Sequence, residues 1–258
     1  MTKPAGSPAI SVVVITLNEE SNIARCLESV QWSDDIIVID SGSSDATCNI
    51  ARNLGAKVIH NDWPGFGKQK QFASTQARHD WVLSLDADEW LTEILSNELV
   101  KLIASPPRHH VYKIRRRHYF MGRLLRHGIA YPDDVLRLYN RKYADWNDNP
   151  VHESIQHSGE TGFITGDILH ESAPTLGRYI EKLNRYTEIQ ANERFAKDQH
   201  VGLMHLLLLP FWQFLRGYLF KLGFLDGIPG LVHNIIAALN TFLRYAKLRE
   251  LHILEERK

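Results

Sequence analysis

The chain has 258 residues, of which 30 are basic and 30 are acidic, so it carries no formal net charge and its pI is about 7.2. This length allows one large domain, or one domain with a substantial appendage. The balanced charge excludes the overall basic character typical of nucleic-acid-binding proteins, so partners must be argued from local patches. The two cysteines fall in predicted helices and do not indicate a disulfide framework, which favours a reducing compartment. The polar stretch 1–8 lacks the apolar segment of a secretory signal, so we expect a cytoplasmic protein.

The first ninety residues alternate between β-branched runs and segments with helical spacing. Strands are predicted at 10–17, 35–39, 57–60 and 81–85, and a helix is predicted after each of the first three. This order is typical of an α/β fold with a parallel sheet, in which ligands bind beyond the carboxyl ends of the strands. The turn after the first strand contains no glycine and the chain has no P-loop motif, so neither a Rossmann dinucleotide site nor a P-loop is predicted.

Acidic and amide side chains come where three of these strands end. Asn18 and Glu19 follow the first strand, Asp40 ends the second, and Asp86 and Asp88 follow the fourth. We expect these side chains to converge on one crevice. If the fourth strand continues to Asp88, the last two share one side of it, and such a carboxylate pair suits Mg²⁺ or Mn²⁺. An isolated Asp-x-Asp is more typical of a solvated acidic turn, but the residues at the ends of the other strands favour a nucleoside-diphosphate site that uses a metal.

Three motifs in order carry a resemblance to a known family. They are the segments 14–20, 38–47 and 85–89. Together they resemble the family 2 glycosyltransferases, which share the GT-A nucleotide-sugar fold. The segments 149–153, 168–172 and 220–227 resemble the bacterial branch that adds glucose to the inner core of lipopolysaccharide. The resemblance implies a Rossmann-like, mostly parallel sheet and an inverting transferase that uses a UDP-sugar.

The resemblance also implies which residues bind the nucleoside of the donor. The Asp that matches Asp40 binds the uracil and ribose side, and the segment that includes Thr16, Asn18 and Glu19 lines the same base. The alternative for Asp40 is a turn residue that caps the following helix.

Further matches concern the phosphates and the metal. Asp86 is expected to face the ribose or phosphate side, and Asp88 is expected to ligate Mg²⁺ or Mn²⁺. Lys70 stands where many relatives have Arg, and it could offset phosphate or base charge or simply be a solvated helix residue. In several GT-A enzymes a late His completes the metal site, which makes His170 a candidate ligand, although a lone His is also typical of a structural residue.

Glycosyl transfer with inversion needs a general base that takes the proton of the attacking acceptor hydroxyl. Our candidate is Glu153, which follows an aromatic and acidic segment able to stack on a sugar ring. A structural alternative is an ion pair between Glu153 and one of the many Arg residues. Other candidates for the base are His152, Asp133, Asp134 and Glu89.

After the fourth strand the pattern becomes less regular. A helix is predicted at 91–103, and strands at 111–114, 135–139 and 162–169. A run of Arg and His between residues 108 and 127 is typical either of a solvated face or of a surface that binds an anionic acceptor or anionic lipid. Within the second of these strands, Arg137 could lie near the donor phosphates.

The chain from residue 175 is predicted to be helical. The segment 201–215 contains no Lys, Arg, Asp or Glu, but as a helix it would span only about 22 Å and Pro210 interrupts it, so a membrane crossing is disfavoured. Aromatic and basic side chains at its end favour a segment that lies in the membrane interface, and a second amphipathic helix is predicted at 231–250. A buried helical hairpin or a dimer interface is the alternative. The apolar side of the second helix contains Ile235, Leu239 and Phe242.

We therefore expect a GT-A catalytic domain at 1–174, with a nucleotide-sugar half at 10–90 and an acceptor half at 91–174, followed by a membrane-interfacial region at 175–258. The expected activity is metal-dependent transfer of a hexose, glucose from UDP-glucose, onto a heptose of the lipopolysaccharide inner core. The expected location is the cytoplasmic face of the inner membrane. Two alternatives are a transferase acting on a polyprenyl-phosphate or capsule intermediate and a non-catalytic scaffold that binds a nucleotide-sugar.

Overall fold

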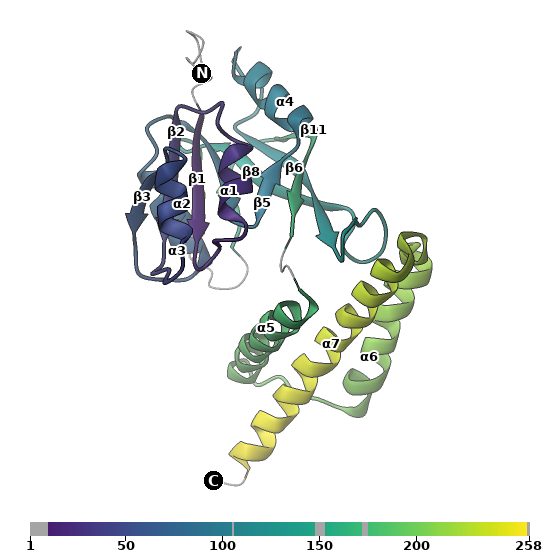
Figure 1. Cartoon of the computed structure of the whole chain (residues 1–258). Coiled ribbons are helices and arrows are strands. Elements are labelled where there is room, and N and C mark those ends of the chain that lie inside the picture. Colours follow the sequence, from purple (N-terminus) through teal and green to yellow (C-terminus); the bar gives the residue numbers. More distant parts are fainter. Residues whose placement is uncertain (1–9, 105, 148–152, 172–174, 257–258) are drawn as a thin grey trace. The chain divides into compact units, whose positions relative to one another are not determined.

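The computed structural model of the protein describes residues 10–104, 106–147, 153–171 and 175–256. The chain divides into two compact units, a sheet unit (1–116 and 133–170) and a helical unit (117–132 and 171–258) (Figure 1). The segment 117–132, which we expected within the catalytic domain, thus belongs with the C-terminal helices. The physical reason is a small apolar cluster, in which Phe120 and Leu125 are buried together with Leu183 and Ile236.

Four parallel strands form the N-terminal half of the main sheet. In spatial order they are β3 (Lys57–His60), β2 (Asp35–Asp40), β1 (Ile10–Thr16) and β4 (Trp81–Asp86). Their pairing confirms the predicted α/β class and the predicted parallel arrangement. The register sets Thr16 beside Asp40 and Ile15 beside Asp86, so the ends of three strands meet at one edge.

The sheet continues beyond β4 with β8, β6, β11 and β5. β8 pairs antiparallel with both β4 and β6, and β5 pairs antiparallel with β11, which sets Glu89 beside His170. A separate pair, β9 and β10, is also antiparallel. Of these strands, β5, β9 and β10 have three residues each, too few for an alternating pattern to reveal them, and they were not predicted. The bounds are β5 (Glu89–Leu91), β6 (Val111–Phe120), β7 (Arg123–Leu124), β8 (Asp133–Asn140), β9 (Ala144–Trp146), β10 (Ile155–His157) and β11 (Thr161–His170).

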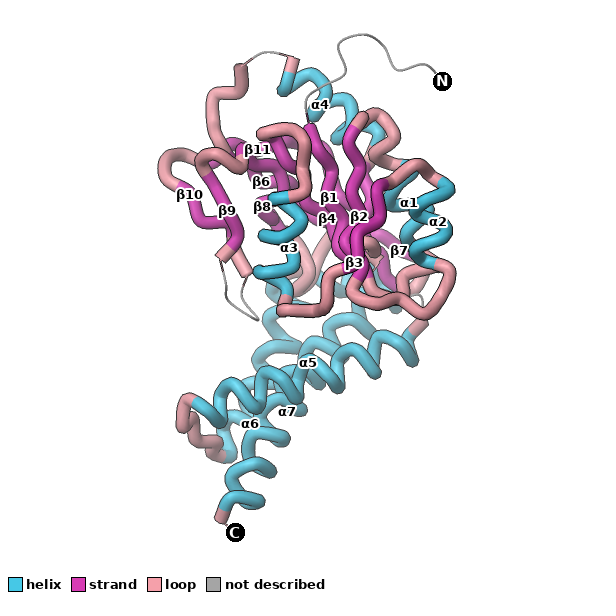
Figure 2. The backbone as a smooth tube through the Cα atoms, turned by 90° about the vertical axis from the view of Figure 1, so that its left-hand side faces the viewer, coloured by secondary structure: helices cyan, strands magenta, loops and turns pink. Residues whose placement is uncertain are grey.

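Apolar layers cover both faces of the parallel strands, as their continuous β-branched sequences require. Val12 and Val14 of β1 face a core built with α1 (Ile23–Glu28), α2 (Thr47–Asn53) and α4 (Glu93–Ile103). Val13 and Ile15 face a second core built with α3 (Phe66–Thr75) and the β9–β10 pair (Figure 2). Because each strand is held from both sides, the loops at its carboxyl end start from fixed positions.

The helical unit is built around one long helix. Its elements are α5 (Leu176–Ala196), α6 (Leu203–Leu215), the π-helical turn η1 (Arg216–Phe220), the 3₁₀ turn η2 (Gly223–Asp226) and α7 (Gly227–Glu255). α5 and α6 both pack along α7. Pro210, which we expected to interrupt the first apolar segment, lies inside α6. By length and hydropathy, none of the described helices qualifies singly as a membrane crossing, whereas Leu203–Phe220 and Gly223–Glu255 qualify as a pair bent by 72°.

Candidate functional site

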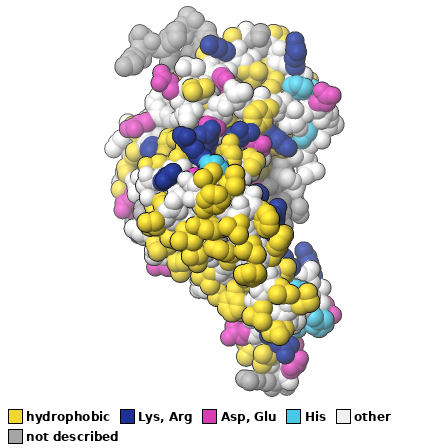
Figure 3. Space-filling view, turned by 90° about the vertical axis from the view of Figure 1, so that its right-hand side faces the viewer, with side chains coloured by type: hydrophobic (Ala, Val, Ile, Leu, Met, Phe, Trp, Pro, Cys, Tyr) yellow, Lys and Arg dark blue, Asp and Glu magenta, His cyan; other side chains and the backbone are white. Residues whose placement is uncertain are grey.

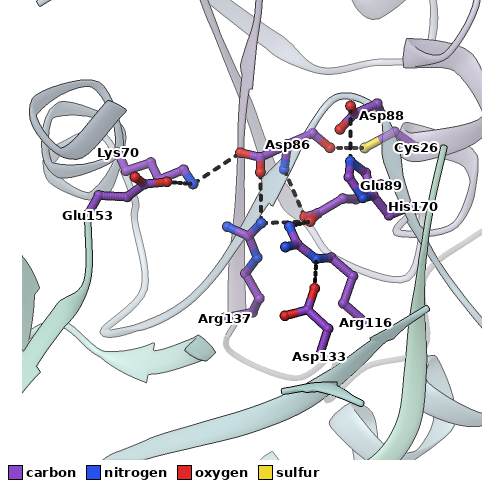
Figure 4. Close-up of polar contacts among 10 residues, drawn as sticks. All are labelled: Cys26, Lys70, Asp86, Asp88, Glu89, Arg116, Asp133, Arg137, Glu153 and His170. Carbon is purple, nitrogen blue, oxygen red and sulfur yellow. Dashed lines mark hydrogen bonds and ion pairs between the residues drawn. The ribbon is translucent and has the colours of Figure 1, made fainter. Parts of the chain in front are cut away.

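The turn that follows β4 organises the polar edge of the sheet unit. β4 ends at Asp86, and Ala87 and Asp88 form a turn before β5. Glu89 closes this turn, because its Oε2 accepts the backbone N–H of Asp86 at 3.1 Å. The expectation that Asp86 and Asp88 share one side of a continuing strand is therefore wrong. The two carboxylates have different partners instead (Figure 4).

Lys70 brings Asp86 close to Glu153, which lies far from it in the sequence. The Nζ atom of Lys70 lies 3.2 Å from Asp86 Oδ1 and 3.2 Å from Glu153 Oε1, and 4.8 Å from the centre of the Trp146 ring. The side chain comes from α3 and is only 2% exposed. The alternative of a solvated helix lysine therefore does not hold. One buried ammonium group contacts both the predicted phosphate-side Asp and the predicted base.

A network of buried charges continues from Asp86 away from Lys70. Arg137 donates to Asp86 Oδ2 at 2.7 Å and to Glu89 Oε1 at 2.6 Å, and Arg116 donates to the same Glu89 oxygen at 3.1 Å. Glu89 is fully buried. A carboxylate held by two guanidinium groups and shielded from solvent is poorly suited to take a substrate proton, so the structure argues against Glu89 as the base.

These contacts fix the protonation states. Burial by itself would raise the pKa of Asp86, but the Arg137 guanidinium and the Lys70 ammonium hold that pKa far below its ordinary value. Burial would likewise lower the pKa of Arg137, whereas Asp86 and Glu89 raise it above its ordinary value. Asp86 and Arg137 are therefore charged at neutral pH, and the side chains of Arg137 and Lys70 both lie at this edge, where they could contact an anionic ligand.

Asp88 and His170 form a separate pair. Asp88 Oδ2 lies 3.2 Å from His170 Nε2, and their side chains are 8% and 11% exposed. His170 is the last residue of β11, which β5 holds in register beside the turn. Among the described residues no group of three or more His, Cys, Asp or Glu is arranged to hold a metal ion. A carboxylate oxygen nevertheless suits Mg²⁺ or Mn²⁺, and a neutral imidazole is a competent ligand for Mn²⁺, when phosphate or water oxygens supply the other ligands.

The loops after β1 and β2 are joined into one wall. The backbone N–H of Asn18 donates to Ser43 Oγ at 2.8 Å, and the N–H of Ser44 donates to Asn18 Oδ1 at 2.9 Å. The N–H of Glu19 donates to Thr47 Oγ1 at 2.8 Å. Asn18 reaches these partners with a φ of 55°, a left-handed conformation that Asn tolerates better than most residues. The two predicted nucleoside-binding segments thus form one continuous surface.

Asp40 and Thr16 lie at the base of this wall. Asp40 Oδ2 accepts the N–H groups of Gly42 and Ser43, each at 3.0 Å. Burial would raise the pKa of Asp40, but these bonds and the Ser43 hydroxyl lower it overall. This is the geometry of a turn cap, and it leaves the carboxylate ionised. The buried Thr16 Oγ1 has no hydrogen-bond partner among the described residues, which is a cost that a bound ligand would remove.

The structure also bears on the other candidates for the base. Asp133 is bonded by Arg116 at 2.7 Å and Asp134 by Arg115 at 3.1 Å, whereas His152 lies outside the described residues. Sequence reasoning missed the role of Arg116. No local sequence pattern reveals this role, because Arg116 lies opposite Asp133 only through the pairing of β6 with β8, and that pairing was not predicted.

Comparisons with known proteins agree on a family. The model of Glycosyl transferase family 2 matches residues 11–165. An uncharacterized glycosyltransferase of Rickettsia typhi is 35% identical over 95% of this chain and 88% of its own length. The lipopolysaccharide core biosynthesis glycosyltransferase LpsC of Rhizobium meliloti is 29% identical over 96% of this chain and 94% of its own length.

Solved structures show more distant likeness. The crystal structure of residues 1–349 of Staphylococcus aureus TarS in complex with UDP is 16% identical, with 95% of this chain and 91% of that chain covered and a TM-score of 0.47. Glucosyl-3-phosphoglycerate synthase from Mycobacterium tuberculosis, in complex with Mn²⁺, UDP and glucosyl-3-phosphoglycerate, is 28% identical over 43% of this chain and 44% of that chain, with a TM-score of 0.37.

Proposed function

Because this chain belongs to glycosyl transferase family 2, we propose that it is an inverting, metal-dependent hexosyltransferase that moves glucose from UDP-glucose onto a heptose of the lipopolysaccharide inner core. One observation carries the chemistry of the proposal. Lys70 lies 3.2 Å from both Asp86 and Glu153, so the Asp expected on the phosphate side of the donor and the carboxylate proposed to take a proton meet at one cationic side chain. A donor bound there has its leaving group and its reacting carbon near the two functions that transfer requires.

In the proposed donor site, the wall after β1 and β2 binds the nucleoside. Asp40 accepts a hydrogen bond from the ribose or the uracil, and the unpartnered Thr16 hydroxyl lies on the neighbouring strand. Asn18 and Glu19 line the base. The diphosphate lies beside Asp86, where Lys70 and Arg137 offset its charge.

The metal proposed for this site is Mg²⁺ or Mn²⁺, held by Asp88 and His170. Their donor atoms lie 3.2 Å apart in a largely buried setting, and Mg²⁺ sites commonly use one or two protein ligands with phosphate and water oxygens as the rest. When bound, the ion would supply positive charge at the diphosphate leaving group. Asp88 must therefore be ionised and His170 neutral for binding.

Glu153 is the proposed general base. The acceptor hydroxyl oxygen attacks the anomeric carbon, the bond from that carbon to the diphosphate oxygen breaks, and the hydroxyl proton passes to the Glu153 carboxylate. Before the reaction, Lys70 holds one oxygen of Glu153 and keeps the carboxylate in place. Attack from the side opposite the diphosphate inverts the configuration at that carbon.

The identity of the acceptor is the most specific element of the proposed activity. LpsC, which resembles this chain along nearly its whole length, is named for lipopolysaccharide core biosynthesis. This supports an acceptor in the lipopolysaccharide core. The proposed place of transfer is the cytoplasmic face of the inner membrane. The heptose and the glucose follow from the resemblance in the segments 149–153, 168–172 and 220–227.

The test is transfer of labelled sugar from a panel of UDP- and GDP-sugars to lipopolysaccharide from truncated-core strains, with Mg²⁺, Mn²⁺ or chelator. We expect transfer from UDP-glucose that is lost in Asp88→Ala and falls about 10²- to 10⁴-fold in Glu153→Gln, while UDP binding survives in the latter. Asp62→Ala, an exposed carboxylate, is the matched control and should keep full activity.

Each failure points to a different part of the proposal. Full activity of Glu153→Gln would remove the base, and transfer in the presence of chelator would remove the metal. Transfer to a polyprenyl-phosphate sugar but to no core would replace the acceptor. Tight UDP binding without transfer or donor hydrolysis would favour the non-catalytic scaffold.

A further inference from the structure

A large exposed apolar face covers the helical unit. It runs along α6, over the turns η1 and η2 and onto α7, and Figure 3 shows its hydrophobic side chains gathered together. Single exposed apolar residues are common on soluble proteins, but contiguous patches mark sites of interaction. Among its exposed members are Leu203 (71%), Leu207 (57%), Phe211 (61%), Phe220 (69%) and Ile228 (71%).

The face follows from helical geometry. On α6, Leu203, Leu207 and Phe211 recur every four residues, and none of the residues of this helix is buried. On α7, Ile228, Ile235 and Leu239 form an outer stripe, whereas the buried residues of that helix lie on the other side. Each helix thus turns one apolar side toward its neighbours and a second apolar side outward.

The charges of this segment are few and of one sign where they are exposed. Between residues 201 and 243 the Lys, Arg, Asp and Glu residues are Arg216, Lys221 and Asp226. Asp226 is 2% exposed, and its Oδ2 accepts the backbone N–H groups of Arg126 and His127 at 3.0 and 2.8 Å. The exposed charge is therefore positive.

Two further cations join them at the turn between α6 and α7. Arg123 donates to the carbonyl oxygen of Leu225 at 3.3 Å, and Arg126 is tied to Asp226 through its backbone. Both side chains are exposed. Arg216 and Lys221 lie at the start and just after the end of η1 in the same turn, and we call these four residues the basic collar.

We propose that the apolar face with its basic collar binds an anionic phospholipid bilayer and enters one leaflet. Apolar and aromatic side chains beside Lys and Arg are the composition of segments that lie in the membrane interface. The bend of 72° between Leu203–Phe220 and Gly223–Glu255 suits a hairpin that enters and returns on the same side. A two-fold pair of chains joined through this face would oppose two basic collars, which disfavours that occupant.

The first experiment is flotation of the full-length chain with vesicles of phosphatidylcholine alone or with three parts in ten of phosphatidylglycerol. We expect the anionic vesicles to carry the protein, and we expect the double variant Phe211→Glu, Phe220→Glu to lower the partition coefficient at least tenfold. Ile94→Glu, at an apolar α4 residue that is 66% exposed in the sheet unit, is the matched control and should bind as the wild type does.

The second experiment separates charge from apolar contact. The variant Arg216→Gln, Lys221→Gln should lose most of the preference for anionic over neutral vesicles. Quenching of tryptophan fluorescence by brominated lipid should fall in Trp212→Phe, whose indole is 53% exposed on α6, but not in Trp63→Phe, which is 46% exposed in the sheet unit.

Unchanged flotation of the Phe211→Glu, Phe220→Glu variant would overturn the proposal, as would equal quenching in both tryptophan variants. A wild type that does not float but forms a dimer dissolved by the same double variant would make the face an interface between copies. Circular dichroism and urea denaturation of each variant show whether the chain has folded. These readouts do not depend on transfer, so they are independent of the proposed function.

Discussion

The two units handle charge in opposite ways. In the sheet unit, the edge beyond β1, β2 and β4 buries ionised groups, and Glu89, Arg137 and Lys70 are each less than 4% exposed. In the helical unit, the surface of α6 and α7 exposes large apolar groups, and the one acidic residue between 201 and 243 is buried and fully bonded. Both arrangements are costly for a protein without ligands.

This contrast indicates what kind of partner each unit binds. Buried charges are retained where they hold one another in a fixed geometry, as around Glu89, and they give an anionic substrate a ready set of contacts. An exposed apolar surface with a cationic border needs a partner that is apolar within and anionic at its edge. We therefore expect the anionic substrate at the sheet unit and the lipid surface at the helical unit.

The largest effect is expected from removing the centre of the buried network. Glu89→Ala removes the carboxylate that Arg137 and Arg116 share and leaves each guanidinium with one partner, Asp86 or Asp133. Because removing one partner of a buried ion pair is strongly destabilising, we expect a loss of about 3–5 kcal/mol of unfolding free energy. Asp134→Ala is the control, because it breaks the partly exposed pair with Arg115, and should cost less than about 1 kcal/mol. Urea denaturation measures both. Equal losses of unfolding free energy in the two variants would mean that the buried network stabilises the fold no more than an exposed ion pair does.

The helical unit has a buried titratable group whose effect depends on pH. Burial lowers the pKa of His233 to about 4, with a further lowering from His118, while Asp226 acts in the opposite direction. Since the unfolded chain has a His pKa near 6.5, it binds the proton first, so the unfolding free energy falls as the pH drops from about 6.5 toward 4. The loss is up to about 3 kcal/mol.

The measurement compares the wild type with His233→Phe, which keeps the ring packing against Phe120 and Tyr179. The difference in unfolding free energy between the two proteins isolates this residue from the carboxylates, which titrate in both. That difference should change by about 3 kcal/mol between pH 7.5 and pH 4. A constant difference would contradict a buried neutral imidazole.

The same contrast explains what the sequence could predict. The parallel strands were predictable because long β-branched runs followed by helical periods reveal them locally. The three-residue strands β5, β9 and β10 were not, because their pairing depends on distant partners. On α7, Ile235, Leu239 and Phe242 were correctly assigned to one side, but periodicity does not tell whether an apolar side faces a core or solvent, and here each of them is exposed.

The site was predicted to a similar extent. Residues at the ends of strands could be placed at one edge, because side-by-side parallel strands require it. The division of Asp86 and Asp88 between different partners could not be predicted, because it depends on a turn whose closure by Glu89 is specific to the folded chain. Likewise, the contact of Lys70 with Glu153 joins residues 83 positions apart, and no local pattern reports such a contact.

A smaller effect is expected on ligand binding in the sheet unit. Lys70→Gln removes the buried ammonium beside Asp86, and the loss of a charged hydrogen bond to a phosphate is expected to weaken UDP binding about 10- to 100-fold. Uridine has no phosphate, so its affinity should change little. Titration calorimetry with both ligands checks this, and an equal loss for uridine would mean that Lys70 supports the fold of the site and not the phosphates.

The smallest effect concerns how tightly the helical unit is packed. A Cβ atom at Gly217 would lie 2.0 Å from Asn234 Oδ1 and 3.4 Å from the Ile129 Cβ atom, so Gly217→Ala must displace the buried Asn234, which we expect to cost about 2 kcal/mol of unfolding free energy. Gly177→Ala, near the start of α5, meets nothing closer than 4.0 Å and should be neutral or stabilise by up to about 1 kcal/mol. Urea denaturation measures the change in unfolding free energy in both variants. A loss in Gly217→Ala without a loss in Gly177→Ala would show that the turn between α6 and α7 is held rigidly against α7. Equal effects would mean that it yields, and a yielding turn would present the apolar face in no fixed shape.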